Sequence, residues 1–556
     1  MGLAKWFDQS QLPLRAAHDS ANALHSCAYA GPMPRALADL GKQVWPVTLH
    51  KIRPSTVSDF AFFGFAGVIL AAYLVLIKGQ LTYGLEYDES YLLSVAANIA
   101  DGQGFIDDGV SFWTSGTPFD PNISTGPVLL VPGAIAWKIS GGSLALIRLV
   151  PVCFFVLFMA ATAFMYYRWR GRWVAAGALI GPLLLPVLAP DLANQSLMPG
   201  RFVGEIAAAA LLLTAAVFLS IGRDFAAGVI AGLAILAKLN FALPTLVLLL
   251  VWLITRWAAH RSGLRHTARQ YLLGAVIPLA LFEFYKLVVL GFSGYWRQLS
   301  LLADFTAQQS VPLPHLAGEA FNKAVSLMRL TSGPVIAVAL ALIIASICIL
   351  LLFPFLNLQQ ESPLREDMST APSTVVAVSL TALFIVASWV LTSSQASLRP
   401  AIPGVLIVTS LTTASLVIAA WTVWERSSGR IFSMLKLAPV LAIGLLVAVT
   451  AYQGLRIDKN LAGQQLLQNQ EQAAAIISRE VSELPVDGFW TSPEFSVLTG
   501  LPYSHEGRNA PELVVLTSIR ALLEVGRPDA TALVDLCGEI LYETRDVVLC
   551  RPLLGA

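Results

Sequence analysis

Two adjacent carboxylates, Asp88 and Glu89, follow the first long apolar segment of this sequence by about ten residues. The stretch around them, from Gly79 to Trp137, contains seven carboxylates and no Lys or Arg. Carboxylates are costly near lipid, and packing alone seldom requires them there. A carboxylate at a membrane surface can instead accept the proton of a hydroxyl group that attacks a substrate. The pair therefore indicates base-catalysed transfer at a membrane interface.

The same carboxylates also suit a structural role. At the start of a helix over residues 90–100, Asp88 would accept hydrogen bonds from unpaired backbone N–H groups, and its charge would suit the helix dipole. A cap of this kind is compatible with catalysis by either carboxylate. Both interpretations are open at this point.

The composition predicts the class of protein that carries this pair. Charged residues make up 13% of the 556 residues and hydrophobic residues 56%, and the mean hydropathy is +0.68. A soluble protein would carry roughly twice as many charges. The net charge of +1 gives no indication of nucleic-acid binding. We therefore expect an all-α polytopic membrane protein.

Apolar runs long enough to cross a bilayer recur along the chain, and they predict about eleven transmembrane helices. These spans are expected at 58–78, 144–167, 173–190, 202–222, 225–238, 241–255, 270–291, 334–356, 372–392, 401–423 and 436–453. Residues 126–140 are apolar but short and contain Pro132, so they are expected to lie in the outer interface as a juxtamembrane helix anchored by Trp137 and Lys138.

The basic loops set the orientation of the spans. Short loops rich in Arg follow the second, the sixth and the tenth span, around Arg170, Arg265 and Arg430. The positive-inside rule places these loops and the N-terminus in the cytoplasm. The acidic loop 79–143 then lies outside, as do the short segments before residues 202 and 401.

Three regions are expected along the chain. Residues 1–56 form a cytoplasmic segment without the apolar core of a signal peptide, and residues 57–453 form the transmembrane domain with its outer loop 79–143. Residues 454–556 are polar and mixed, with an amphipathic helix over 471–483 and strands near Gly488 and Val547, which predicts a small α/β extracytoplasmic domain. Cys537 and Cys550 flank a hairpin there, and an oxidising compartment would allow them to pair.

Several charged residues are expected to meet the acidic pair at the outer surface. They are Arg201 and Glu205 at the start of one span, Lys238 in a tight turn, Glu283 and Lys286 on one helix, and Arg399 before Pro400. Carboxylates in such a cleft could abstract a proton, and the cations could hold a phosphate leaving group. Two structural alternatives are open: Arg201 and Lys238 could extend to lipid headgroups, and Glu283 and Lys286 could form an intrahelical pair.

Several motifs resemble those of the GT-C superfamily of membrane glycosyltransferases, in particular the branch of protein O-mannosyltransferases and aminoarabinose transferases. They are Tyr87-Asp-Glu-Ser-Tyr91 with the helix after it, Ser124-Thr-Gly-Pro, Leu146-Ile-Arg-Leu, Gly204-Glu, Gly232-Leu-Ala-Ile-Leu-Ala-Lys238 and Phe489-Trp-Thr-Ser-Pro-Glu. Gly126 departs from the paired prolines of many relatives, and Ala237 from their Thr.

The resemblance implies a GT-C fold and the transfer, with inversion, of a hexose or pentose from a polyprenyl-phosphate donor. It implies Asp88 as the general base, with Glu89 beside it, and Lys238 and Arg399 as phosphate contacts. Tyr91, Arg201 and Glu205 are further substrate-binding candidates. It also implies a bacterial inner membrane, an active site facing the periplasm, and a lipid, glycan or protein acceptor.

Other functions remain open from the sequence. A transporter or flippase of lipid-linked saccharides would show internal repeats and charges at the middle of the bilayer, which this sequence lacks. A non-catalytic scaffold would have no use for so many charges at one depth. No cofactor is expected; a divalent metal between Asp88, Glu89 and Glu205 is possible but not favoured.

Overall fold

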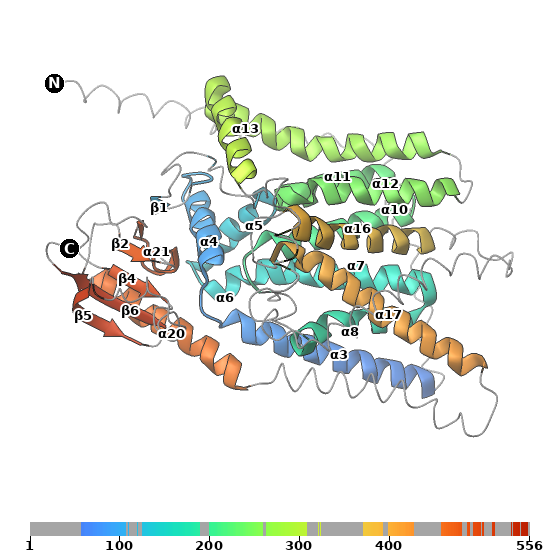
Figure 1. The fold of residues 1–556 in the computed structure, drawn as a ribbon, viewed down its shortest axis with the longest axis horizontal. Helices are drawn as coiled ribbons and strands as arrows, with labels where there is room; N and C mark the ends of the chain where they lie inside the picture. The colour runs from blue at the N-terminus through green and yellow to red at the C-terminus, as the bar shows by residue number, and fades with distance from the viewer. Residues whose placement is uncertain are drawn as a thin grey trace, which may run out of the picture. The chain divides into compact units, whose positions relative to one another are not determined.

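The computed structural model of this chain is mostly helical (Figure 1). It describes residues 57–106, 109–110, 119, 125–188, 200–258, 263–308, 318, 321, 323, 371–392, 399–426, 457–480, 486–489, 493–501, 503–504, 514–517, 535, 537–544 and 546–553. The compact unit described below runs from Phe62 to the C-terminus.

Long apolar helices coincide with the predicted spans wherever the structure describes them. They are α3 (Val57–Leu81), α7 (Leu149–Arg170), α8 (Arg172–Leu188), α10 (Gly204–Ser220), α11 (Asp224–Ala237), α12 (Ala242–Ala258), α13 (Leu264–Gln308), α16 (Ala371–Thr392) and α17 (Ile402–Arg426). Within the described ranges, five continuous helical stretches are long and apolar enough to cross a membrane. The protein is therefore a multi-pass membrane protein. The spans at 334–356 and 436–453 fall outside the described residues, so the count of about eleven stays a prediction.

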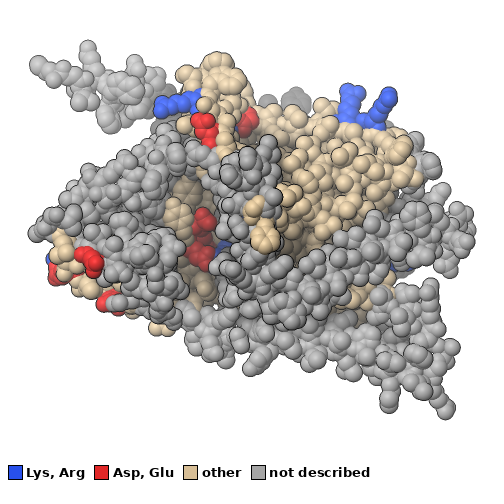
Figure 2. All heavy atoms as spheres, in the orientation of Figure 1, with Lys and Arg blue, Asp and Glu red and all other residues tan. Residues whose placement is uncertain are grey.

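The helices differ in how much of their surface is buried. Helix α10 is alanine-rich and buried on almost every side, and it packs against α7, α11 and α16. Helix α13, which is kinked at Gly291, exposes an apolar face that includes Val276, Phe284 and Phe292. Because lipid is as apolar as these side chains, such a face needs no protein cover. On the side drawn in Figure 2, the described surface is mostly uncharged.

Shorter helices lie in the connections between the spans. They are α4 (Tyr87–Ala100), α5 (Pro127–Ser140), α6 (Leu144–Ile147), and the 3-10 helices η1 (Leu239–Phe241) and η4 (Arg399–Ala401). Helix α5 has 14 residues, so it is about 21 Å long and shorter than the hydrocarbon core of a bilayer. Helix α11, which overlaps an expected span, has the same length, so the juxtamembrane position expected for 126–140 stays a prediction.

The C-terminal part combines two helices with a mixed sheet. Helix α20 (Ile457–Glu480) begins well before the amphipathic segment that the sequence indicated, and α21 (Pro493–Thr499) follows it. The strands are β1 (Gly109–Val110), β2 (Val486–Phe489), β3 (Tyr503–Ser504), β4 (Val514–Thr517), β5 (Cys537–Glu543) and β6 (Val547–Pro552), in the order β1-β3-β2-β4-β6-β5. The edge strand β1 comes from the segment 79–143 between the first two expected spans and pairs in parallel with β3. The sheet is therefore completed by a segment nearly four hundred residues away in the sequence.

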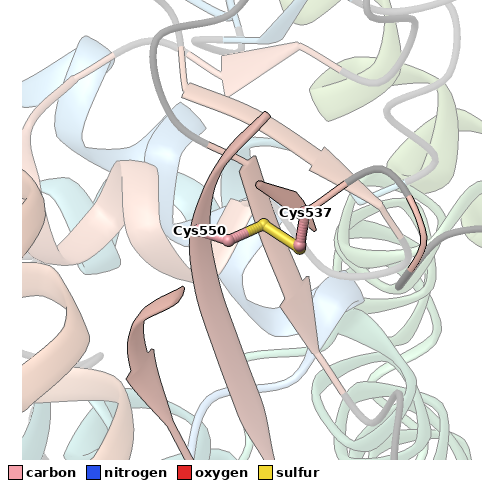
Figure 3. The surroundings of a disulfide bond; sticks show 2 residues. All are labelled: Cys537 and Cys550. Atoms are coloured by element: carbon pink, nitrogen blue, oxygen red, sulfur yellow. A yellow bond between two sulfur atoms is a disulfide. The ribbon is translucent and has the colours of Figure 1, made fainter. Parts of the chain in front are cut away.

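The C-terminal part has its own core and a disulfide bond. Ala473 and Ile477 of α20 and Phe495 of α21 pack against Val515 and Leu549 of the sheet. Cys537 and Cys550 lie on the antiparallel strands β5 and β6 and form a disulfide bond (Figure 3). The pairing that the spacing allowed is present.

Candidate active site

The two carboxylates Asp88 and Glu89 lie in the first turn of α4. The helix begins at Tyr87, and its N-cap is Glu86, whose side chain makes no capping hydrogen bond. The interpretation of Asp88 as the cap of a helix beginning at residue 90 is therefore wrong, because the helix starts three residues earlier. Both carboxylates still lie in the first turn, at the positive end of the helix dipole.

Glu89 is buried and bound by a guanidinium group. Its side chain is 1% exposed, and Arg148 at the start of α7 donates to both carboxylate oxygens, from Nε to Oε1 and from Nη2 to Oε2, each at 2.8 Å. Arg148 also donates to backbone oxygens, from Nη1 to that of Tyr83 at 2.6 Å and from Nη2 to that of Gly84 at 3.3 Å. This geometry fixes the turn between α3 and α4. The only signal for it in the sequence was a lone Arg opening an apolar span.

Asp88 has a different environment from its neighbour, because its side chain is exposed. Tyr91, one turn further along α4, is half-buried against the helical core. Of the two carboxylates, only Asp88 is open to an incoming molecule in the described structure. Proton transfer requires that access.

Arg201 belongs to a second ion pair, in which the arginine is buried and the carboxylate is half-exposed. It lies just before α10, is 7% exposed, and donates from both terminal nitrogens to the Glu86 carboxylate. The ring of Tyr83 lies 5.8 Å from its guanidinium carbon. Nearby, the backbone N–H of Phe202 donates to Glu89 Oε1 at 3.3 Å. The start of α10 is thereby joined to the start of α4, with Glu86 as a partner that the sequence did not indicate.

Glu205 and Lys238 form a third ion pair, and both of its side chains are buried. Glu205 in the first turn of α10 is 2% exposed and Lys238 at the end of α11 is 6% exposed, and Lys238 Nζ lies 3.3 Å from Glu205 Oε1. Lys238 Nζ also donates to Thr125 Oγ1 at 3.4 Å. The alternative in which Arg201 and Lys238 extend to lipid headgroups is wrong, because both are buried in ion pairs.

Thr125 and Gly126 pack closely against the end of α11. Thr125 pairs with Lys238 in an antiparallel bridge, and the backbone N–H of Gly126 donates to the oxygen of Ala237 at 3.4 Å. A Cβ atom on Gly126 would lie 2.1 Å from the backbone oxygen of Leu236. The close approach requires glycine here, which accounts for the departure from proline in this motif.

An apolar pocket opens beside Thr125 and Gly126. It has a volume of about 110 Å³, and its lining includes Phe105, Phe119, Phe282, Glu283 and Lys286. The rings of Phe105 and Phe119 stack at a centroid distance of 5.1 Å.

The pocket wall on α13 carries the intrahelical ion pair. Lys286 is 5% exposed, and its Nζ lies 2.7 Å from Glu283 Oε1. The Tyr295 hydroxyl, beyond the kink, donates to Glu283 Oε2 at 3.0 Å. The intrahelical interpretation of Glu283 and Lys286 is therefore confirmed.

The structure brings most of the predicted site residues to one region. Hydrogen bonds and ion pairs connect the starts of α4 and α10, and a further pair connects α10 to the end of α11. Arg399 begins η4, which packs against α16 and α17, but its side chain lies outside the described part of the structure. In the described ranges, no group of three or more His, Cys, Asp or Glu residues is arranged to hold a metal ion. Metal independence stays a prediction.

Comparisons with known proteins support the fold. Neither a protein-family model nor a curated protein sequence matches the chain. Among solved structures, ArnT from Cupriavidus metallidurans bound to undecaprenyl phosphate is similar, with a TM-score of 0.53 at 15% identity over 88% of this chain and 98% of ArnT.

A second similar structure is the archaeal oligosaccharyltransferase AglB from Archaeoglobus fulgidus, in complex with an inhibitory peptide and a dolichol-phosphate. Its TM-score is 0.50 at 12% identity, over 89% of this chain and 75% of AglB. The chain therefore has the GT-C fold, the fold that its motifs predicted.

Proposed function

We propose that this protein is an integral membrane glycosyltransferase. It takes a sugar from a polyprenyl-phosphate donor and transfers it to an acceptor at the outer side of the membrane, with Asp88 as the general base. The observation that carries this proposal is the difference in exposure among the carboxylates of the site. Asp88 is exposed, whereas Glu89 and Glu205 are buried beside Arg148 and Lys238, and the half-exposed Glu86 is bound by Arg201.

The proposed reaction is a direct displacement. The acceptor hydroxyl attacks the anomeric carbon of the sugar while Asp88 takes the hydroxyl proton, and the bond from that carbon to the phosphate oxygen breaks. The polyprenyl phosphate leaves with the bonding electron pair, so negative charge develops on its oxygens. Cations aimed at those oxygens lower the barrier because they bind the developing charge more strongly than the ground state.

Lys238 and Arg399 are the proposed phosphate contacts. Lys238 lies 3.3 Å from Glu205 and 3.4 Å from the Thr125 hydroxyl, and a lysine ammonium can bind more than one acceptor. Thr125 also lines the apolar pocket. A phosphate at Lys238 would therefore have an aromatic, apolar wall beside it, which suits the isoprenoid part of a lipid donor.

The other candidates have supporting roles in this proposal. Arg201 and Glu205 fix the start of α10 through their ion pairs, and Tyr91 lies on the same helix as Asp88 and can contact the sugar. Glu89 orients α4 through Arg148 and takes no proton. This mechanism requires no metal ion.

Binding of the bare lipid phosphate tests the donor class. Undecaprenyl phosphate added to the purified protein in detergent is expected to raise its thermal unfolding midpoint, because a ligand that binds only the folded state stabilises it. Undecaprenol, which lacks the phosphate, is the matched control and is expected to have a much smaller effect.

The Lys238→Met variant keeps the length of the side chain but removes its charge. We expect it to bind undecaprenyl phosphate at least tenfold more weakly, since a charge-assisted hydrogen bond contributes about 1.5–3 kcal/mol. The exposed Lys138, replaced by Met, is the control and should bind as the wild type does. Equal stabilisation by undecaprenyl phosphate and undecaprenol would contradict a phosphate-bearing donor.

A further inference from the structure

The short segment that leads into α4 is held by a side chain of the C-terminal part. The backbone N–H of Leu85 donates to Gln470 Oε1 at 2.9 Å, and Gln470 Nε2 donates to the oxygen of Leu85 at 3.0 Å. Both residues are 2% exposed. One amide thus pairs with both backbone groups of a residue three positions before Asp88, as a neighbouring strand would.

The backbones of the two regions also approach one another directly at this point. The N–H of Gly84 donates to the oxygen of Gly463 at 3.0 Å. A Cβ atom on Gly84 would lie 2.4 Å from Leu466, and one on Gly463 would lie 2.2 Å from the Tyr83 ring. Helix α20 therefore packs closely against this segment.

A second C-terminal side chain, Glu494, lies near the same turn. It lies on α21, which packs against α4, and it is 1% exposed. In the described part of the chain, its Oε2 has no hydrogen-bond partner. Burial, and then the nearby charges of Asp88 and Glu89, raise the pKa of the Glu494 carboxyl well above its ordinary value of 4.5, against the lowering effect of its own backbone N–H.

The charge around Glu494 also depends on the side chains that the other elements packed against α21 bring near it. On α20, which also packs against α21, the charged residues Glu471, Arg479 and Glu480 are exposed. The third neighbour, β3, contributes Tyr503, whose side chain lies outside the described residues. Burial of the carboxyl, with the carboxylates of Asp88 and the Arg148-paired Glu89 nearby, therefore disfavours the charged form of Glu494.

We propose that Gln470 and Glu494 are positioning residues through which the C-terminal domain fixes Asp88 for catalysis. The proposal rests on Asp88 being the general base. Gln470 sets the path of the chain into α4, and the buried Glu494 lies on α21 where that helix packs against α4. The chemistry requires such support, because a displacement of about 1 Å in a reacting group can cost about 10² in rate.

Replacing Gln470 tests the first contact. Gln470→Leu removes both hydrogen bonds at similar size, and Gln468→Leu on the exposed face of the same helix is the matched control. We expect Gln470→Leu to speed amide exchange in a peptide spanning residues 82–93 and to lower kcat by about 10–100-fold. The KM for the polyprenyl-phosphate sugar should stay unchanged, because the phosphate contacts are elsewhere.

Two outcomes would overturn the Gln470 contact: wild-type exchange over residues 82–93, or an unchanged kcat. Gln470→Glu, which keeps the acceptor and loses the donor, serves if the Leu variant does not fold. Amide exchange is measured in the absence of the sugar-transfer reaction. The exchange result would therefore still test the Gln470 contact if Asp88 were not the general base.

Replacing Glu494 tests the second contact through pH. Since the folded-state pKa is raised, the stabilisation is present at low pH and is lost as the pH rises through that value. Glu494→Gln stays neutral, so its unfolding midpoint should exceed that of the wild type by a margin that grows with pH. The wild-type rate should decline at alkaline pH as Glu494 ionises, and Glu494→Gln should lose part of this decline.

The exposed Glu471, replaced by Gln, is the control and should follow the wild type at every pH. Parallel pH dependences of stability in the wild type and Glu494→Gln would overturn this role of Glu494. A pH–rate profile that is unchanged despite a changed stability would leave Glu494 as a purely structural residue and would also overturn the proposal.

Discussion

At the residue scale, Glu89 is buried in an ion pair, whereas its neighbour Asp88 is exposed. A buried carboxylate such as Glu89 is tolerated only when a partner satisfies its charge and its hydrogen-bonding capacity. Arg148 does both, with two bonds of 2.8 Å to Glu89 and further bonds to backbone oxygens. Glu89 is therefore part of the framework that presents Asp88.

Removal of Arg148 should destabilise the protein strongly. Arg148→Gln leaves the Glu89 carboxylate buried without its cation, and loss of one partner of such a pair costs about 3–5 kcal/mol. Lys138→Gln is the control, because the Lys138–Asp101 pair at 3.5 Å is exposed and exposed pairs contribute about 0–1 kcal/mol. Thermal unfolding in detergent measures both, and equal shifts would contradict a framework role for Arg148.

The sequence could identify the acidic pair but could not separate its members. Asp88 and Glu89 are adjacent, equally acidic and equally costly near lipid, so composition treats them alike. Glu89 differs from its neighbour in being buried against Arg148, which lies 59 positions away from it in the sequence. Contacts of that separation depend on the packing of α4 against the start of α7, which no local pattern encodes.

At the element scale, the contact of Thr125 and Gly126 with the end of α11 positions Lys238. The strand-like bridge between Thr125 and Lys238 fixes the backbone of the lysine, and the Thr125 hydroxyl accepts from its ammonium group. The contact is possible because Gly126 has no Cβ. The segment at Thr125 and Gly126 and the end of α11 therefore together position Lys238 and form part of the pocket wall.

Gly126→Ala should disrupt this element pair. Its Cβ would lie 2.1 Å from a backbone oxygen, so the segment must move, at a cost of about 1–3 kcal/mol typical of overpacking. We expect a lower unfolding midpoint and weaker binding of undecaprenyl phosphate. Gly67→Ala in α3, where a Cβ would meet nothing within 4 Å, should change neither. A Gly126→Ala protein with wild-type lipid binding would contradict the assigned role.

Helices were more predictable than strands in this chain. The spans follow from long apolar runs, and α5 follows from a short one. The start of α20 was missed because residues 457–470 are polar and carry little apolar periodicity. Strand β1 was missed because two residues, Gly109 and Val110, form a strand only through pairing with β3.

At the scale of the whole molecule, the disulfide bears on the orientation of the chain. Cys537 and Cys550 are joined, and such bonds persist in oxidising compartments. This agrees with the predicted position of the C-terminal domain outside the cytoplasm. The basic loops around Arg170 and Arg265 predict the same orientation independently.

Cysteine labelling tests this orientation. In protein taken from intact cells and unfolded in detergent, a bulky maleimide should react with Cys537 and Cys550 only after reduction. The Cys537→Ser variant should gain reactivity at Cys550 without reduction and serves as the control. Full labelling of the wild type without reduction would contradict an extracytoplasmic C-terminal domain.

The assignment of Asp88 as the general base is tested most directly by turnover of Asp88→Asn. The substrates are undecaprenyl-phosphate-linked hexoses and pentoses, and the signal is release of undecaprenyl phosphate. The amide keeps the shape of the side chain but cannot take the proton, so turnover should fall by about 10²–10⁴ while the affinity for undecaprenyl phosphate stays near that of the wild type. An Asp88→Asn protein with near-normal turnover would contradict the assignment.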